Sequence, residues 1–129
     1  MEAILDTNFI ITCVKQKIQV FDVIKDMQEI SEIAIPLEVT NELEKIQKNP
    51  KFNKSEREAA ELSLFMIKKK NLTITILGTK EVDSGLLRYC IQNPCIIATL
   101  DRNLKEKIRK KSPKTKFLTI RNKRKIEIQ

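Results

Sequence analysis

Short apolar runs alternate along the chain with longer stretches in which apolar residues recur every three or four positions. The short runs predict strands, because they are apolar and rich in β-branched residues. They cover residues 3–5, 33–35, 72–77, 95–99 and 117–120, with one more short edge strand expected at 126–128. The longer stretches predict helices at residues 19–31, 36–48, 55–70, 84–92 and 102–111. Strands that alternate with helices are typical of an α/β domain built on a parallel sheet.

Local sequence signals give more detail on three of these elements. Pro36 suits the start of a helix, because the N–H that it lacks has no helical partner there. Ser55, with Glu58 three residues later, is a capping-box signature for the helix at 55–70. The run 95–99 has no polar alternation, so we expect both faces of that strand to be buried. No linker or repeat interrupts the pattern, so we expect one domain over residues 1–129.

Composition narrows the functional classes. The chain is 41% hydrophobic, which excludes a disordered tail, and no apolar run approaches the roughly 20 residues of a membrane span. It has no histidine, which excludes Ser-His and Cys-His catalysis, and only two glycines, which excludes a P-loop or a dinucleotide-binding turn. No signal peptide is visible and the three cysteines lack motif spacing, so we expect a reduced, cytoplasmic protein.

The net charge of +8 suggests a polyanionic partner, and its distribution is uneven. Residues 1–100 carry 13 basic and 14 acidic side chains, whereas residues 101–129 carry 12 basic and three acidic ones. A solvated basic face is the simplest explanation of this segment, and contact with a nucleic-acid backbone is the functional one. The candidates for such contacts are Arg102, Lys105 and Arg109 at helical spacing, together with Arg121, Lys123 and Arg124.

Acidic residues stand where parallel strands are expected to end. Asp6 follows the first strand and Asp101 follows the strand at 95–99, so the two would face each other if these strands are neighbours. Glu42 lies in the helix at 36–48, and Asp83 precedes the helix at 84–92. Each residue alone could be a helix cap or a solvated side chain, and Glu38 and Glu81 are given no further role. Four carboxylates in one cleft repel each other unless a cation lies among them, and a ligand set made only of oxygen favours Mg²⁺ or Mn²⁺.

Four motifs that contain these acids resemble those of PIN-domain nucleases. They are Leu5–Phe9, Val39–Lys45, Val82–Leu87 and Ile97–Lys105, and they cover the chain in the expected order. The resemblance implies a three-layer fold whose central parallel sheet has the order 3-2-1-4-5. It also implies an endoribonuclease that uses Mg²⁺ or Mn²⁺ and leaves 5′-phosphate and 3′-hydroxyl ends.

The resemblance assigns metal-binding and catalytic roles to Asp6, Glu42, Asp83 and Asp101. It gives supporting roles to Thr99, and to Asn8 as a side chain that orients Asp6. Many members carry a further acid where this chain has Asn103, whose amide oxygen can still bind a metal or a water.

Three functions stay open at this point. The runs Glu42–Lys45 and Asp101–Lys105 look most like those of small archaeal PIN proteins similar to a small-subunit rRNA-processing nuclease. Toxins of the VapC type share the same four acids. A catalytically silent RNA-binding or ribosome-assembly module is the third reading, and Asn103 is the residue that favours it. The expected partners are RNA, a second copy in a homodimer, and an antitoxin or a ribosome-assembly factor.

Overall fold

The computed structural model describes residues 1–129 and contains six strands and six helices. The strands are β1 (Glu2–Leu5), β2 (Glu32–Pro36), β3 (Thr73–Thr75), β4 (Cys95–Ala98), β5 (Lys116–Arg121) and β6 (Lys125–Ile128). The helices are α1 (Thr7–Lys15), α2 (Val20–Lys25), α3 (Leu37–Lys48), α4 (Lys54–Lys69), α5 (Val82–Gln92) and α6 (Arg102–Lys111). None of these helices is both long and apolar enough to cross a membrane.

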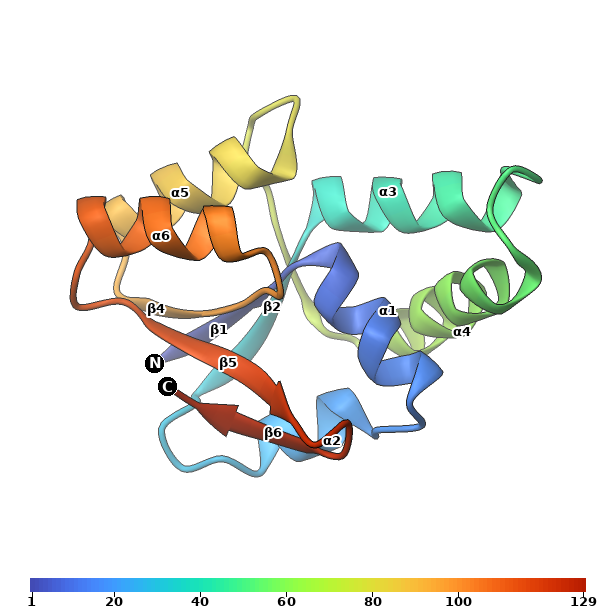
Figure 1. Cartoon of the computed structure of the whole chain (residues 1–129), viewed down its shortest axis with the longest axis horizontal. Helices are drawn as coiled ribbons and strands as arrows, with labels where there is room; N and C mark the ends of the chain where they lie inside the picture. The colour runs from blue at the N-terminus through green and yellow to red at the C-terminus, as the bar shows by residue number, and fades with distance from the viewer.

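All six strands form one sheet in the order β3-β2-β1-β4-β5-β6. The first five are parallel, which confirms the predicted order, and β6 adds an antiparallel edge strand beside β5. From β1 the chain crosses first toward β2 and β3 and later toward β4 and β5, so α5 and α6 cover one face while α1 and α4 lie on the other (Figure 1). The direction of winding therefore changes between β1 and β4, which is where open α/β sheets form their binding crevice.

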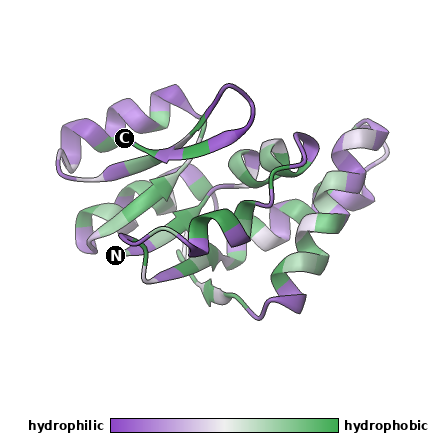
Figure 2. Cartoon of the chain, turned by 90° about the horizontal axis from the view of Figure 1, so that it is seen from below, coloured by the Kyte–Doolittle hydropathy of each residue, from purple (hydrophilic) through white to green (hydrophobic).

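The core lies around the two central strands. Every residue of β4 is buried, as predicted from its unbroken apolar run, and Ala3, Ile4 and Leu5 of β1 are fully buried. The middle of the sheet is mostly hydrophobic, while α6 and the turn of the β5–β6 hairpin are largely hydrophilic (Figure 2). Rigid, buried strands in the centre of the sheet fix the positions of the residues that follow them.

Helix α1 was not predicted from the sequence. It begins directly after Asp6, whose side chain accepts a hydrogen bond from the Thr7 N–H, so the segment expected to be a loop or a cap is the cap of a nine-residue helix. Phe9, Ile10 and Ile11 are consecutive and all buried. A helix that is buried on most sides lacks the polar stripe that reveals a 3.6-residue period, and this hides α1 in the sequence.

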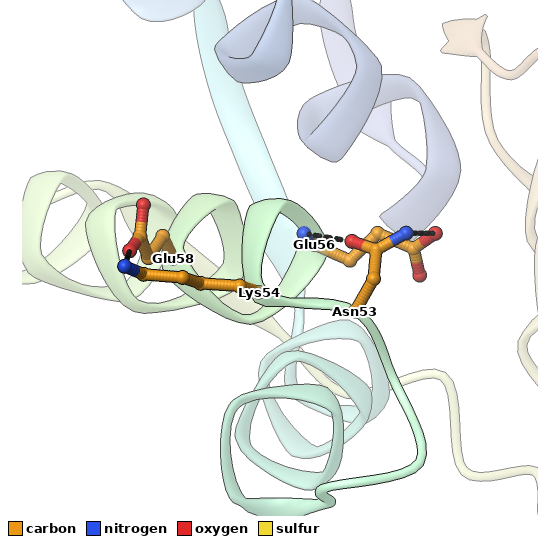
Figure 3. A network of polar contacts seen from close by, with 4 residues as sticks. All are labelled: Asn53, Lys54, Glu56 and Glu58. Carbon is orange, nitrogen blue, oxygen red and sulfur yellow. Dashed lines mark hydrogen bonds and ion pairs between the residues drawn. The ribbon is translucent and has the colours of Figure 1, made fainter.

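The start of α4 differs from the predicted capping box by two residues. Asn53, and not Ser55, precedes the helix, and its side-chain oxygen accepts a hydrogen bond from the Glu56 N–H at 2.8 Å (Figure 3). The Asn53 amide also donates to the Glu56 carboxylate at 3.2 Å. Lys54, the first residue of α4, and Glu58 form an exposed ion pair at 3.8 Å.

Two other elements are shorter than predicted. Helix α2 ends at Lys25, and the apolar residues Met27 and Ile30 that continued its pattern pack on the core from turns. Strand β3 keeps only three residues, because beyond Thr75 the chain turns toward α5. Helix α5 in turn begins two residues earlier than expected, which places Asp83 inside its first turn.

Candidate active site

A cavity of about 640 Å³ opens at the carboxyl ends of the central strands. All four predicted acids line it, and each comes from a different part of the fold. Asp6 directly follows β1 and caps α1, Glu42 lies in the middle of α3, Asp83 lies in the first turn of α5, and Asp101 caps α6. Asn8 lines the same cavity. The structure therefore brings together residues that are up to 95 positions apart in the sequence.

Asp6 is held in place from both sides. Its backbone N–H donates to the Ala98 carbonyl of β4 at 2.9 Å, and its two carboxylate oxygens accept from the Thr7 N–H and the Thr99 hydroxyl, both at 2.8 Å. The Thr99 hydroxyl oxygen also accepts from the Asp101 N–H at 3.2 Å. Thr99, which is fully buried, therefore links Asp6 to Asp101 through these two hydrogen bonds.

Glu42 and Asp101 are anchored by neighbouring helices. Glu42 accepts a hydrogen bond of 2.5 Å from the hydroxyl of Thr7, a buried residue that the sequence did not single out. Asp101 accepts from the backbone N–H groups of Asn103 at 2.9 Å and Leu104 at 3.1 Å, as a helix cap does. Asn103 is exposed, and its contact with Asp101 is made by the backbone rather than by its amide.

The carboxylates oppose each other's ionisation. Burial raises the pKa of Asp6 to about 6, and the negative charges of Asp83 and Glu42 add to this rise against the lowering effect of the Thr99 and Thr7 hydrogen bonds. Burial also raises the pKa of Asp83, followed by the charges of Asp101 and Glu42, while Lys107 lowers it. The cavity thus concentrates negative charge that the surrounding side chains only partly compensate.

Comparison with known proteins identifies the fold. A family described as "PIN like domain" matches residues 3–123. The chain belongs to the PIN-like domain family. Ribonuclease VapC4 of Methanocaldococcus jannaschii is 30% identical over 125 residues, which cover 95% of this chain and 92% of that protein. A solved structure of the PIN domain endonuclease Utp24 is 27% identical, with a TM-score of 0.79 over 99% of this chain and 90% of that one. The resemblance to PIN-domain nucleases noted in the four motifs is confirmed.

The donor chemistry of this PIN domain fits a hard divalent cation. All four acids offer carboxylate oxygen, which Mg²⁺ and Mn²⁺ prefer, and the cavity contains no histidine or cysteine that would favour a softer metal. As the side chains stand, no group of three His, Cys, Asp or Glu residues is arranged so that it could hold a metal ion. Binding of one ion by three or more of these carboxylates therefore requires their side chains to move within the cavity.

Several lining residues of the PIN-domain cavity were missed by sequence reasoning. Lys45 lies three residues after Glu42 and so shares its side of α3, which is a signal that the helical period could have given. Lys80 comes from the loop before α5, and Phe52 comes from the loop between α3 and α4. Glu81, which the sequence placed near Asp83 without a role, lines the cavity beside Lys80. No sequence pattern places these two loops beside Asp6, because their position depends on how the helices pack.

The predicted RNA-binding residues lie outside the cavity lining. Lys105 and Arg109 of α6 lie over the Phe117 ring of β5, at 5.9 and 5.1 Å from its centroid. The residues Arg121, Lys123 and Arg124 lie at the β5–β6 hairpin, where Arg121 pairs with Glu127 at 3.4 Å. Among the basic residues of α6, it is Lys107 that acts on Asp83. These basic residues therefore lie on α6 and on the β5–β6 hairpin (Figure 1), and none of the six lines the acidic cavity.

Proposed function

We propose that this PIN domain is a metal-dependent endoribonuclease that hydrolyses RNA phosphodiester bonds. The observation that carries the proposal is the convergence of Asp6, Glu42, Asp83 and Asp101 on one cavity at the switch point of the sheet. Family membership supports it, as do the names of the two relatives, one a ribonuclease and the other an endonuclease.

The four acids would hold Mg²⁺ or Mn²⁺ in this reaction. Such an ion, when bound, lowers the pKa of a coordinated water and stabilises the negative charge that develops on the phosphate during hydrolysis. The chain's own contribution is placement. Thr99 and Thr7 bind Asp6, and the same Thr7 binds Glu42, so hydrogen bonds from neighbouring residues orient two of the four acids.

Lysines beside the acids suit an RNA substrate. Lys45 and Lys80 line the cavity together with the four carboxylates. In the proposed complex they bind the phosphates on either side of the scissile bond, while the metal occupies the acidic centre. Contacts of this kind are independent of base sequence and weaken as salt rises.

The activity is tested with an end-labelled single-stranded RNA incubated with Mn²⁺ or Mg²⁺. We expect the wild type to cleave it, and Asp6→Asn and Asp101→Asn to lose at least about 100-fold in rate, because each removes a charged ligand. Glu61→Gln is the matched control, since it removes the same charge from an exposed position on α4. Binding without cleavage by every form would instead support the silent RNA-binding module that Asn103 favours.

The biological role has a second candidate. Similarity to a protein named VapC4 favours a toxin, whereas the runs Glu42–Lys45 and Asp101–Lys105 favour a processing nuclease. A toxin is expected to arrest growth when expressed and to be relieved by an antitoxin partner. Unimpaired growth during expression of a form that is active in vitro would argue for RNA processing.

A further inference from the structure

Glu38 is an acidic residue with a contact that no catalytic role explains. It lies in the first turn of α3, and its two carboxylate oxygens accept hydrogen bonds from two consecutive backbone N–H groups. The Leu77 N–H donates at 3.0 Å and the Gly78 N–H at 2.9 Å. Both belong to the loop that joins β3 to α5, so Glu38 binds the segment that leads directly to Asp83.

The same loop is fixed from the side of α5. The Arg88 guanidinium donates a hydrogen bond to the Leu77 carbonyl. Gly85 lies so close to the loop that an added Cβ would be only 2.7 Å from the Leu77 Cβ. Gly78 has a φ of 75°, which allows the sharp turn that aims its N–H at Glu38. The loop thus bridges α3 and α5.

Through these contacts, helix α3 is connected to the surroundings of both Asp6 and Asp83. Glu38 and Glu42 are four residues apart and lie on one side of the helix. Glu42 binds Thr7, the residue next to Asp6, while Glu38 binds the loop before Asp83. We propose that Glu38 is a positioning residue that sets the place of Asp83 relative to Asp6, and so the affinity of the site for its divalent ion. This inference rests on the proposed function.

The charge of Glu38 matters to this role. Slight burial alone would raise the pKa of Glu38, but hydrogen bonds from backbone N–H groups, with Leu77 and Gly78 among the donors, hold it below its usual range. The carboxylate therefore stays ionised at neutral pH and accepts with both oxygens. A glutamine of the same shape would present an N–H₂ group to one of the two donors and break half of the contact.

The test compares Glu38→Gln and Glu38→Ala with the wild type. Mn²⁺ binding is measured by electron paramagnetic resonance of the free ion, and cleavage of labelled RNA is measured as a function of Mn²⁺ concentration. We expect Glu38→Gln to bind Mn²⁺ about tenfold more weakly and Glu38→Ala more weakly still, with KM for RNA unchanged. Saturating Mn²⁺ should restore most of the cleavage rate of Glu38→Gln, which loss of folded protein would not allow.

Glu44→Gln is the matched control, because it removes a carboxylate from the same helix at an exposed position. Arg88→Met loosens the loop from the α5 side and is expected to weaken Mn²⁺ binding in the same direction. If Glu38→Ala fails to fold, Glu38→Gln and Arg88→Met carry the comparison. Unchanged Mn²⁺ binding in both would overturn the positioning role alone. A wild type that neither binds Mn²⁺ nor cleaves RNA would overturn the proposed function and this role with it.

Discussion

A single buried carboxylate links the chemistry of this protein to its stability. Asp6 is only 5% exposed, and its pKa is raised to about 6 in the fold, against about 4 in an unfolded chain. The folded state therefore binds this proton more tightly than the unfolded state does. The contribution of Asp6 to the free energy of unfolding is fully present below about pH 4 and is lost as the pH rises through about 6.

Replacing Asp6 should remove that dependence. In EDTA, we expect Asp6→Asn to gain stability over the wild type as the pH rises from 4 to 7, by up to about 3 kcal/mol. The gain should level off above the folded pKa, and Mn²⁺ should reverse it by compensating the wild-type charge. Urea unfolding followed by circular dichroism at several pH values measures this difference. Asp26→Asn, at an exposed position after α2, should show no comparable trend.

One aromatic residue, Phe52, belongs to the wall of the cavity. It lines the cavity from a turn in which the Asn49 carbonyl accepts from the Phe52 N–H at 3.1 Å and the Asn49 side chain accepts from the Lys51 N–H at 3.0 Å. An aromatic residue on the cavity wall can stack on an unpaired base of an RNA that is bound there. Phe9, Phe21 and Phe117, in contrast, are buried.

Phe52→Leu keeps an apolar side chain but loses the aromatic face, so we expect RNA binding to weaken about tenfold, within the range for loss of one stacked base. The comparison uses an RNA with one abasic nucleotide next to the cleavage site. That RNA should bind wild type and Phe52→Leu equally. Phe65→Leu is the control, because Phe65 is 60% exposed on α4 and does not line the cavity. Equal losses for the two variants would exclude stacking on Phe52.

The sequence predicted the helices and strands whose apolar residues recur with a clear period. It failed where burial or packing removes that period. The five parallel strands were correct because each is a short apolar run between polar segments, and their ends located Asp6 and Asp101. Helix α1 was missed because Phe9, Ile10 and Ile11 leave no polar stripe. The same reasoning singled out the four acids that line the cavity but gave no role to Thr7 or Glu38, because the partners of these two residues come from other elements. Contacts of that kind become visible only when the helices are packed.

The N-terminal cap of α4 is Asn53 in the structure, whereas the sequence predicted Ser55. Asn53→Ala removes the side-chain acceptor of the Glu56 N–H, so we expect a loss of about 1 kcal/mol in unfolding free energy. Ser55→Ala should change stability by a few tenths of a kcal/mol at most, because Ser55 lies within the helix and is exposed. Urea denaturation of the two variants distinguishes the caps. A larger loss for Ser55→Ala would favour the capping box expected from the sequence.

Across the whole molecule, the charge of +8 separates into an acidic cavity and basic surfaces of different origin. Lys45 and Lys80 stand in the cavity itself, while the C-terminal basic residues follow α6 and the β5–β6 hairpin. The hairpin turn places Asn122 and Lys123 at φ values of 55° and 56°. Asparagine is a common choice for such a turn, but glycine is the unstrained residue at the second position, where this chain has a lysine.

That turn allows a substitution in which stability and RNA binding are expected to change in opposite directions. Lys123→Gly relieves the left-handed backbone, so we expect the unfolding free energy to rise by up to about 1 kcal/mol. It also removes one cation from the surface proposed to hold the RNA backbone, so RNA should bind more weakly. The plot of log affinity against log salt should become shallower by about 0.7, the value for one phosphate contact on a single strand. Binding is measured in EDTA by fluorescence anisotropy, with Lys68→Ala on α4 as a control for net charge. If the control changes the slope as much, the hairpin contributes only to the overall charge; if Lys123→Gly alone does, the RNA extends from the acidic cavity to the far edge of the sheet.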